Sequence, residues 1–352
     1  MIKKGPLPVI GLLYFSLLAA AVSCESQGRK EREESMRTDT LPDSIAGWPR
    51  GVVEVRIRSS FDSTDQPALF WAPPDLEGPR PLLVALHTWS GNYLQESSVP
   101  YQRWCAEHGW VFIHPNFRGP NNTPQAAGSL AAYADILDAV TYARQKAHVD
   151  SGRIYLAGVS GGGHMSLLTA GREPGIWAAV SSWVPISDLA AWYAQCAGRG
   201  PDRAKYAGDM IAACGGPPGT GAEVDSQYSI RSPLTILGRA VGVPIEICAG
   251  IDDGYTGSVP ISHTLRAFNI LAKANGMPGK KLTERQIEYF VERRGVPPEL
   301  KGEVEEDPAY GENKVLFRRS AGPVRVTIFA GGHEIVYEAA LSWLDGHRKS
   351  CF

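Results

Sequence analysis

The sequence predicts an α/β fold with a mostly parallel central sheet, helices on both faces and an antiparallel N-terminal edge. Short apolar runs alternate with longer segments of helical periodicity, the pattern of strands joined by crossover helices. The central runs are continuously apolar, as expected of strands covered on both faces. Polar side chains that can carry chemistry directly follow several of these runs, and in a parallel sheet such residues gather at one edge.

The predicted elements alternate along the chain from residue 52 onward. Residues 52–58 alternate apolar and polar at period two, so this strand and the next are expected to form the half-buried antiparallel edge. Strands are expected at residues 52–58, 68–73, 81–86, 110–115, 153–157, 177–185, 244–250 and 324–330. Helices are expected at residues 93–108, 130–148, 258–275, 282–294 and 335–347, and another begins at His164.

Two segments interrupt this alternation within a single folded domain, residues 45–352. Residues 186–240 are aromatic and rich in Gly and Pro, and residues 277–320 are strongly charged. We interpret both as insertions into an α/β domain, and we expect them to determine which substrate is accepted.

The first 44 residues are expected to lie outside this domain. Lys3 and Lys4 precede an apolar stretch, residues 8–22, that is too short for a spanning helix and is typical of a secretion signal. Small residues before Cys24 resemble a bacterial lipobox, in which the cysteine is lipidated. Cleavage after the alanines at 19–21 is the alternative.

These features predict an exported protein. Residues 1–23 would be a signal peptide of the lipoprotein type, and the polar residues 24–44 a flexible tether. The protein would then lie in the periplasm or cell envelope, and a lipid on Cys24 would be its only membrane attachment.

Composition and cysteine usage exclude several classes of protein. The formal net charge of −2 and the lack of a Lys/Arg cluster argue against a nucleic acid partner. No His/Cys spacing suggests zinc, so we expect neither metal nor cofactor. Cys196 and Cys214 bracket a glycine-rich loop and are the best candidates for a disulfide, although sequence cannot fix the pairing. Cys248 lies in an apolar strand and is predicted to be a buried free thiol.

The clearest chemical motif lies between Leu156 and His164. An apolar strand stops, turns on glycines and enters a helix, and the turn reads Gly158-Val159-Ser160-Gly161-Gly162. This G-x-S-x-G pattern is the form of a nucleophile elbow, which lifts one serine hydroxyl out of the sheet. Ser160 is therefore the predicted nucleophile. An ordinary turn with an idle serine is the weaker alternative in this context.

A nucleophilic serine needs a base within hydrogen-bond reach, and the base needs an orienting acid. His333 follows the last predicted strand and is the predicted base among eight histidines. Asp253 follows the strand at 244–250 and is the predicted acid. Asp252 beside it, and Asp188 after the strand at 177–185, remain alternative acids.

An oxyanion hole needs two backbone N–H donors. Gly161, directly after the nucleophile, is the first predicted donor. The second comes from the loop after the strand at 81–86, where Thr88 and Trp89 are candidates and Trp89 is preferred. Its indole would also form a wall of the site. We expect His87 on this loop to be structural and His164 to pack near the site.

Together these motifs resemble the catalytic domain of the prolyl oligopeptidase family of S9 serine peptidases, over about residues 65–348. The motifs that carry the resemblance are Asn116 to Gly119, Val149-Asp150 with Arg153-Ile154, the elbow, Gly250 to Asp253, and Gly331 to His333. The resemblance implies an α/β-hydrolase fold, with Ser160, Asp253 and His333 as nucleophile, acid and base. The β-propeller of the full-length peptidases has no counterpart in the pattern, nor have the paired glutamates that hold a peptide N-terminus in dipeptidyl-peptidase relatives.

We therefore expect an exported serine hydrolase that works through an acyl-enzyme. The first hypothesis is an esterase acting on small or carbohydrate-borne esters, as many single-domain bacterial relatives do. The second is an S9-like peptidase acting on short peptides. The third is a non-catalytic binding protein on a hydrolase scaffold.

Overall fold

The structure is a computed structural model, and it describes residues 45–74 and 78–349, besides Met1 and Gly5. The side chain of Asp202 is not described. The predicted signal peptide, the predicted lipidation at Cys24 and the predicted tether all lie outside the described residues.

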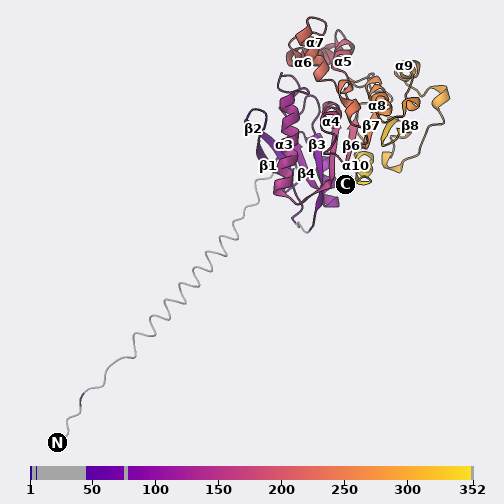
Figure 1. Cartoon of the computed structure of the whole chain (residues 1–352). Helices are drawn as coiled ribbons and strands as arrows, with labels where there is room; N and C mark the ends of the chain where they lie inside the picture. Colours follow the sequence, from indigo (N-terminus) through magenta and orange to yellow (C-terminus); the bar gives the residue numbers. More distant parts are fainter. Residues whose placement is uncertain (2–4, 6–44, 75–77, 350–352) are drawn as a thin grey trace. The chain divides into compact units, whose positions relative to one another are not determined.

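One sheet organises the domain. Its strands run in the order β1-β2-β4-β3-β5-β6-β7-β9-β8, which Figure 1 shows as a progression of colour across the molecule. Their bounds are β1 (Val53–Arg58), β2 (Asp65–Trp71), β3 (Arg80–Leu86), β4 (Val111–Pro115), β5 (Val149–Val159), β6 (Ala179–Trp183), β7 (Ile245–Gly250), β8 (Val315–Ala321) and β9 (Val324–Phe329). The six neighbouring strands β4, β3, β5, β6, β7 and β9 pair in parallel, and β1, β2 and β8 form antiparallel edges.

Helices cover both faces of the sheet. The first face packs against α3 (Leu130–Lys146), α4 (Gly161–Arg172) and α8 (Ser262–Ala274) in the larger apolar core. The second face packs against α2 (Val99–His108) and α10 (Tyr337–Asp345) in a smaller one. No described helix combines the length and apolarity needed to cross a membrane.

This arrangement confirms the predicted fold class, that of an α/β-hydrolase. The reason lies in the central strands: every residue of β4, β6 and β7 is buried, which requires cover on both faces. The carboxyl ends of β5, β7 and β9 lie at the same edge because these strands are parallel.

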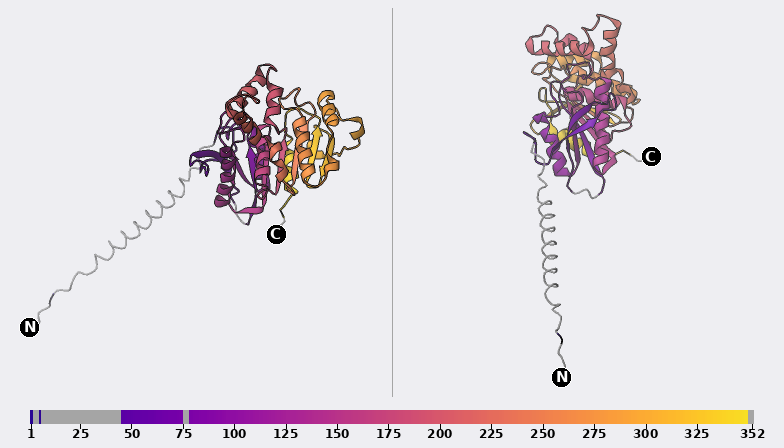
Figure 2. Two further views of the ribbon diagram at one scale, coloured as in Figure 1. Left: turned by 45° about the horizontal axis from the view of Figure 1, so that its top comes forward. Right: turned by 90° about the vertical axis from the view of Figure 1, so that its left-hand side faces the viewer.

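The segment 186–240 folds into three helices that form a cap. They are α5 (Leu189–Cys196), α6 (Pro201–Cys214) and α7 (Ala222–Ile230), with a third apolar cluster between them. Figure 1 shows them grouped at the top of the domain, and the two views of Figure 2 show the same grouping. The cap lies over the edge of the sheet at which Ser160 is found, since Trp89 packs within its cluster.

The segment 277–320 was predicted to be entirely an insertion, and this is wrong for its last part. It contains α9 (Glu284–Arg293), as expected, but its end is the edge strand β8. The charged side chains of β8 obscured the strand in the sequence. Arg318 is buried and pairs with Asp307, while Arg319 pairs with Glu303, so both charges are satisfied within the fold.

A second difference concerns β5, which begins at Val149 and not at residue 153 as expected from the sequence. Asp150 keeps this start in place because its carboxylate accepts hydrogen bonds from the N–H of Gly152 and from Arg153.

Candidate active site

Ser160 occupies a sharp turn between β5 and α4. Its backbone angles are φ 60° and ψ −116°, a region that residues with a side chain rarely adopt. The turn is fixed from both sides, because the N–H of Ser160 donates to the Trp183 carbonyl at 2.9 Å and its carbonyl accepts from His164 N–H at 2.8 Å. The surrounding structure therefore holds the strained residue in position.

The glycines around Ser160 are required by close backbone approach. A Cβ atom on Gly158 would lie 2.3 Å from the Gly162 carbonyl carbon. A Cβ atom on Gly161 would lie 2.4 Å from the backbone nitrogen of Trp89. Neither contact is tolerable, which explains the residue types of the motif.

The structure brings Ser160, His333 and Asp253 into one hydrogen-bonded line. Nε2 of His333 lies 2.9 Å from Ser160 Oγ, and Nδ1 of His333 lies 2.8 Å from Asp253 Oδ2. The Asp253 side chain is 1% exposed and that of His333 is 22% exposed. The line therefore runs from a buried carboxylate to a serine at the edge of the sheet.

Backbone donors orient the carboxylate of Asp253. Its Oδ1 atom accepts from the N–H of Gly254 at 2.8 Å and from that of Val259 at 3.3 Å, which leaves Oδ2 facing His333. Gly257 of the same loop packs directly on the His333 side chain, since a Cβ atom there would lie 2.3 Å from His333 Cβ. Gly257 was not singled out from the sequence, because nothing in its local pattern signals this contact.

The two alternative acids lie elsewhere. Asp252 points away from the imidazole and forms an exposed ion pair with Arg294 at 3.3 Å. Asp188 is the N-cap of α5, where its Oδ1 accepts from Ala191 N–H at 3.0 Å. Neither is hydrogen-bonded to His333 in the described structure.

Two backbone N–H groups converge beside Ser160. Those of Gly161 and Trp89 donate no hydrogen bond among residues 45–74 and 78–349, and the close approach of Gly161 to Trp89 nitrogen makes them neighbours. The N–H of Thr88, the other candidate, already donates to Gln95 Oε1 at 3.1 Å. The geometry therefore leaves Trp89 as the better-placed donor of the two.

The sequence suggested that the Trp89 indole would form a wall of the site, but the indole is not exposed there. It is only 2% exposed and lies in the cap cluster, 4.8 Å edge-to-face from the ring of Trp192. Its Nε1–H donates to Asp209 Oδ2 of α6 at 3.2 Å. The cap thus holds the loop that carries the Trp89 N–H.

A second cap residue contacts the loop that carries the acid. Arg203 of α6 donates to the carbonyls of Gly254 and Gly257 at 2.5 Å and 3.0 Å. Sequence analysis did not identify Asp209 or Arg203. Both lie in the segment 186–240, where no local motif marks them, and the loop residues that they contact are 51 or more residues away along the chain.

The other histidines near the site are buried and engaged. Burial lowers the pKa of His164 to about 4, and its Nε2 contacts the Arg231 carbonyl at 2.7 Å. Burial likewise lowers the pKa of His87 to about 4, and its ring stacks on that of Phe117 at 3.8 Å. Both therefore have the packing roles expected from the sequence.

The cysteine prediction is only partly correct. Cys248 is a buried free thiol, as expected. Cys196 and Cys214 are also free: both are buried in the cap cluster and form no disulfide, so the predicted pairing is wrong. Among the described residues, no group of three or more His, Cys, Asp or Glu is arranged to hold a metal ion.

Part of the chain is similar to a known family. The model of the prolyl oligopeptidase family (Peptidase_S9) matches residues 97–198, which include the elbow. A comparison with curated protein sequences gives no match.

Solved structures share the fold over most of the chain. Acylaminoacyl peptidase from Pyrococcus horikoshii is 16% identical, with a TM-score of 0.53 over 83% of this chain and 40% of the peptidase. A putative dipeptidyl aminopeptidase IV from Bacteroides ovatus is 15% identical, with a TM-score of 0.56 over 84% of this chain and 36% of its own. An acetyl xylan esterase from Paenibacillus sp. R4 is 17% identical, with a TM-score of 0.55 over 84% of both chains.

The chain therefore spans 40% or less of the two peptidases and most of the esterase. These identities show a common fold. The chain has the α/β-hydrolase fold, and its residues 97–198 match the prolyl oligopeptidase family.

Proposed function

We propose that this protein hydrolyses carboxylic esters, with Ser160 as nucleophile, His333 as general base and Asp253 as orienting acid. The observation that carries the proposal is the continuous line from Ser160 Oγ through the imidazole to Asp253, with links of 2.9 Å and 2.8 Å. Such a line matches the requirement for an activated serine.

The reaction follows from this geometry. Ser160 Oγ attacks the ester carbonyl while His333 Nε2 takes the hydroxyl proton, and the Asp253 carboxylate stabilises the imidazolium. The imidazolium then gives its proton to the departing alcohol, which leaves an acyl group on Ser160. His333 next activates a water molecule, which releases the acid and restores the serine.

The tetrahedral intermediate carries a negative oxygen that needs donors. The N–H groups of Gly161 and Trp89 are the proposed pair, because they adjoin Ser160 and donate to no other atom of the described structure. Removal of one such donor typically costs about 10²- to 10³-fold in kcat.

Two observations favour esters, including carbohydrate-borne esters, over peptides. All nine described strands belong to one sheet, so residues 45–74 and 78–349 contain no propeller of the kind that restricts access in the full-length peptidases. The acetyl xylan esterase is covered over 84% of its length, whereas the compared peptidases are much longer than this chain.

The test compares ester and amide turnover. Nitrophenyl acetate and butyrate should be hydrolysed, while aminoacyl and prolyl nitroanilides should be turned over far more slowly. Amide turnover at rates rivalling the esters would instead support an S9-like peptidase. A fluorophosphonate probe should label the wild type and Ser90→Ala, the control on a neighbouring loop, but not Ser160→Ala. Labelling of Ser160→Ala would refute the nucleophile assignment, and an unlabelled wild type would favour a binding protein.

We also propose that the enzyme is exported and anchored at Cys24, on the basis of the lipobox-like sequence alone. Metabolic labelling with a fatty acid analogue should mark the wild type and not Cys24→Ser, and the variant should leave the membrane fraction. Equal labelling of both would contradict the anchor.

A further inference from the structure

A pocket of about 400 Å³ opens on the α2 side of the sheet, within the size range of small-molecule sites. Its walls come from residues 47–50 ahead of β1, from the end of β2 and from α2. None of these segments carries Ser160, Asp253 or His333, so the pocket is separate from the proposed active site.

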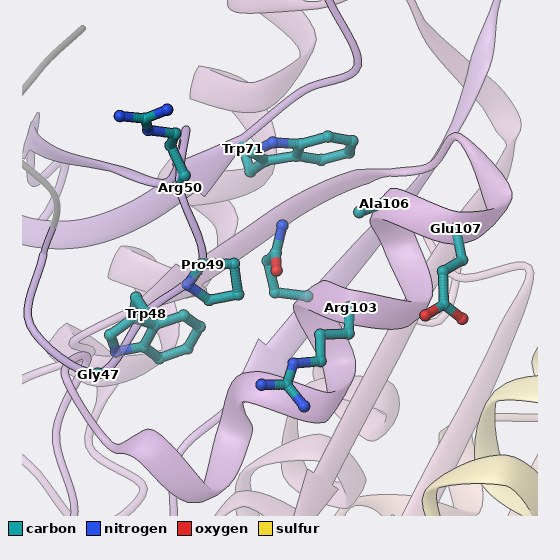
Figure 3. Close-up of a pocket in the computed structure, with 9 residues that line it drawn as sticks. Gly47, Trp48, Pro49, Arg50, Trp71, Arg103, Ala106 and Glu107 are labelled. Carbon is teal, nitrogen blue, oxygen red and sulfur yellow. The ribbon is translucent and has the colours of Figure 1, made fainter.

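Two tryptophans give the pocket rigid apolar surfaces. Trp48 is 6% exposed and held in place, because its Nε1–H donates to the Leu94 carbonyl at 3.2 Å and its ring packs on Phe112 at 5.9 Å. Trp71 ends β2 and is only partly buried. Figure 3 shows these two indoles on different sides of the pocket, with Pro49 between them. A flat apolar ring face could contact the partly exposed Trp71 indole without rearrangement, and the buried Trp48 offers only an edge.

Gln102 supplies an unsatisfied polar group. This residue lines the pocket and is 1% exposed, yet its buried Oε1 atom has no hydrogen-bond partner in the described structure. A buried acceptor without a donor is costly and calls for an explanation. A hydroxyl donor on a bound ligand would satisfy it.

Charged groups complete the lining. Arg50 and Arg103 are exposed, and neither forms an ion pair with any described residue. Glu107 is the one carboxylate among the lining residues, so the pocket carries a net positive charge. Free guanidinium groups bind carboxylates in a bidentate manner, and the Glu107 carboxylate can accept from hydroxyl groups.

We propose that this pocket is a second, non-catalytic binding site for an acidic saccharide, in which a uronic acid residue contacts the tryptophans. Its carboxylate pairs with Arg103 or Arg50, and its hydroxyl groups donate to Gln102 and Glu107. An aromatic carboxylate shares the flat face and the charge but lacks the hydroxyl donors that Gln102 and Glu107 require. The inference goes beyond the proposed ester hydrolysis and does not depend on it.

Binding should be measured by calorimetry and by tryptophan fluorescence on the whole domain, with trigalacturonate as probe and no ester present. We expect millimolar or tighter binding, and about tenfold weaker binding for Arg103→Gln, as for loss of a charge-assisted hydrogen bond. Trp71→Ala should weaken binding at least as much. Neutral xylotriose should bind more weakly than trigalacturonate.

The control variant is Arg144→Gln on α3, an exposed arginine of the opposite face, and it should bind like the wild type. Unchanged thermal midpoints of Arg103→Gln and Trp71→Ala would show that these variants fold. The proposal would be overturned if the wild type did not bind trigalacturonate, or if Arg103→Gln and Trp71→Ala bound it as tightly as the wild type does. Binding of benzoate but not of trigalacturonate would overturn the saccharide assignment. Each of these results leaves the ester hydrolysis test unaffected.

Discussion

At the scale of single residues, Asp253 differs from the neighbouring aspartate by its backbone contacts. Two N–H groups fix its Oδ1 atom, so Oδ2 has one orientation available, toward His333. Asp252 faces solvent and Arg294 instead. Adjacent residues of identical type therefore have very different expected contributions to turnover.

We predict that Asp253→Asn lowers kcat/KM for nitrophenyl acetate by about 10⁴-fold, because an amide would stabilise the wrong tautomer of His333. Asp252→Asn should change it by less than about threefold, as for an exposed ion pair. Steady-state kinetics on the two purified variants measure this. Equal small losses in both would move the role of acid to Asp188.

Gly161 provides a second prediction at this scale. A Cβ atom there would lie 2.4 Å from Trp89 nitrogen, so Gly161→Ala must displace one of the two proposed oxyanion donors. We expect kcat to fall by about 10²-fold or more, as after loss of one donor.

Gly208 serves as the matched control, because it lies within α6 and a Cβ atom there would meet nothing within 4 Å. Gly208→Ala should keep full activity and stabilise the fold slightly, by up to about 1 kcal/mol. Full activity of Gly161→Ala would contradict the placement of the oxyanion hole.

At the scale of elements, α6 connects the cap to the loop that carries Trp89 and to the loop that follows Asp253. Asp209 holds the indole of Trp89, and Arg203 holds the carbonyls of the loop after Asp253. One helix of the cap therefore positions the proposed acid and one proposed oxyanion donor.

We predict that Arg203→Met lowers kcat about tenfold, because the loop loses hydrogen bonds to a charged group, each worth about 1.5–3 kcal/mol. The matched control is Arg199→Met, an exposed arginine before α6 that makes no side-chain hydrogen bond in the described structure. The two variants should be compared by kcat, KM and thermal midpoint. Equal kinetics would show that the cap does not position the loop.

Sequence reasoning selected, from local patterns, three residues whose side chains the structure brings together. Ser160, Asp253 and His333 each follow an apolar strand, and parallel pairing then brings strand ends together. It failed for Arg203 and Asp209, whose partners lie far along the chain. It also failed for β8, since the buried Arg318 and the partly buried Arg319 resemble surface residues until Asp307 and Glu303 are seen to pair with them.

At the scale of the whole molecule, several histidines are buried as neutral groups. Burial lowers the pKa of His263 to about 3, and its Nδ1 accepts from Ser187 N–H. Burial also lowers the pKa of His114 to about 3, with a smaller contribution from nearby His87. Each neutral imidazole is buried within the domain, so protonation of one lowers the free energy of unfolding of the entire domain.

These histidines make stability depend on pH in a defined window. Unfolded histidine binds a proton near pH 6.5, whereas the folded groups do so only near pH 3 or 4. Between these values the unfolded state binds more protons, so the free energy of unfolding falls as pH decreases from about 6.5 toward 4. The slope should be on the order of 1 kcal/mol per pH unit for each buried histidine.

His114→Asn tests this relation, because the asparagine amide can keep a donor near the Tyr93 carbonyl that Nδ1 contacts at 2.8 Å. The variant should be less stable at pH 7, yet its free energy of unfolding should fall less steeply with acid than that of the wild type. The difference in slope should correspond to the uptake of about one proton fewer on unfolding. Urea unfolding at several pH values between about 4.5 and 7 measures both slopes, because this range includes the reference pKa of histidine. The exposed His148→Asn should retain the wild-type slope. If His114→Asn also retains it, then His114 is not buried as a neutral imidazole, and the acid sensitivity of the domain arises from other groups.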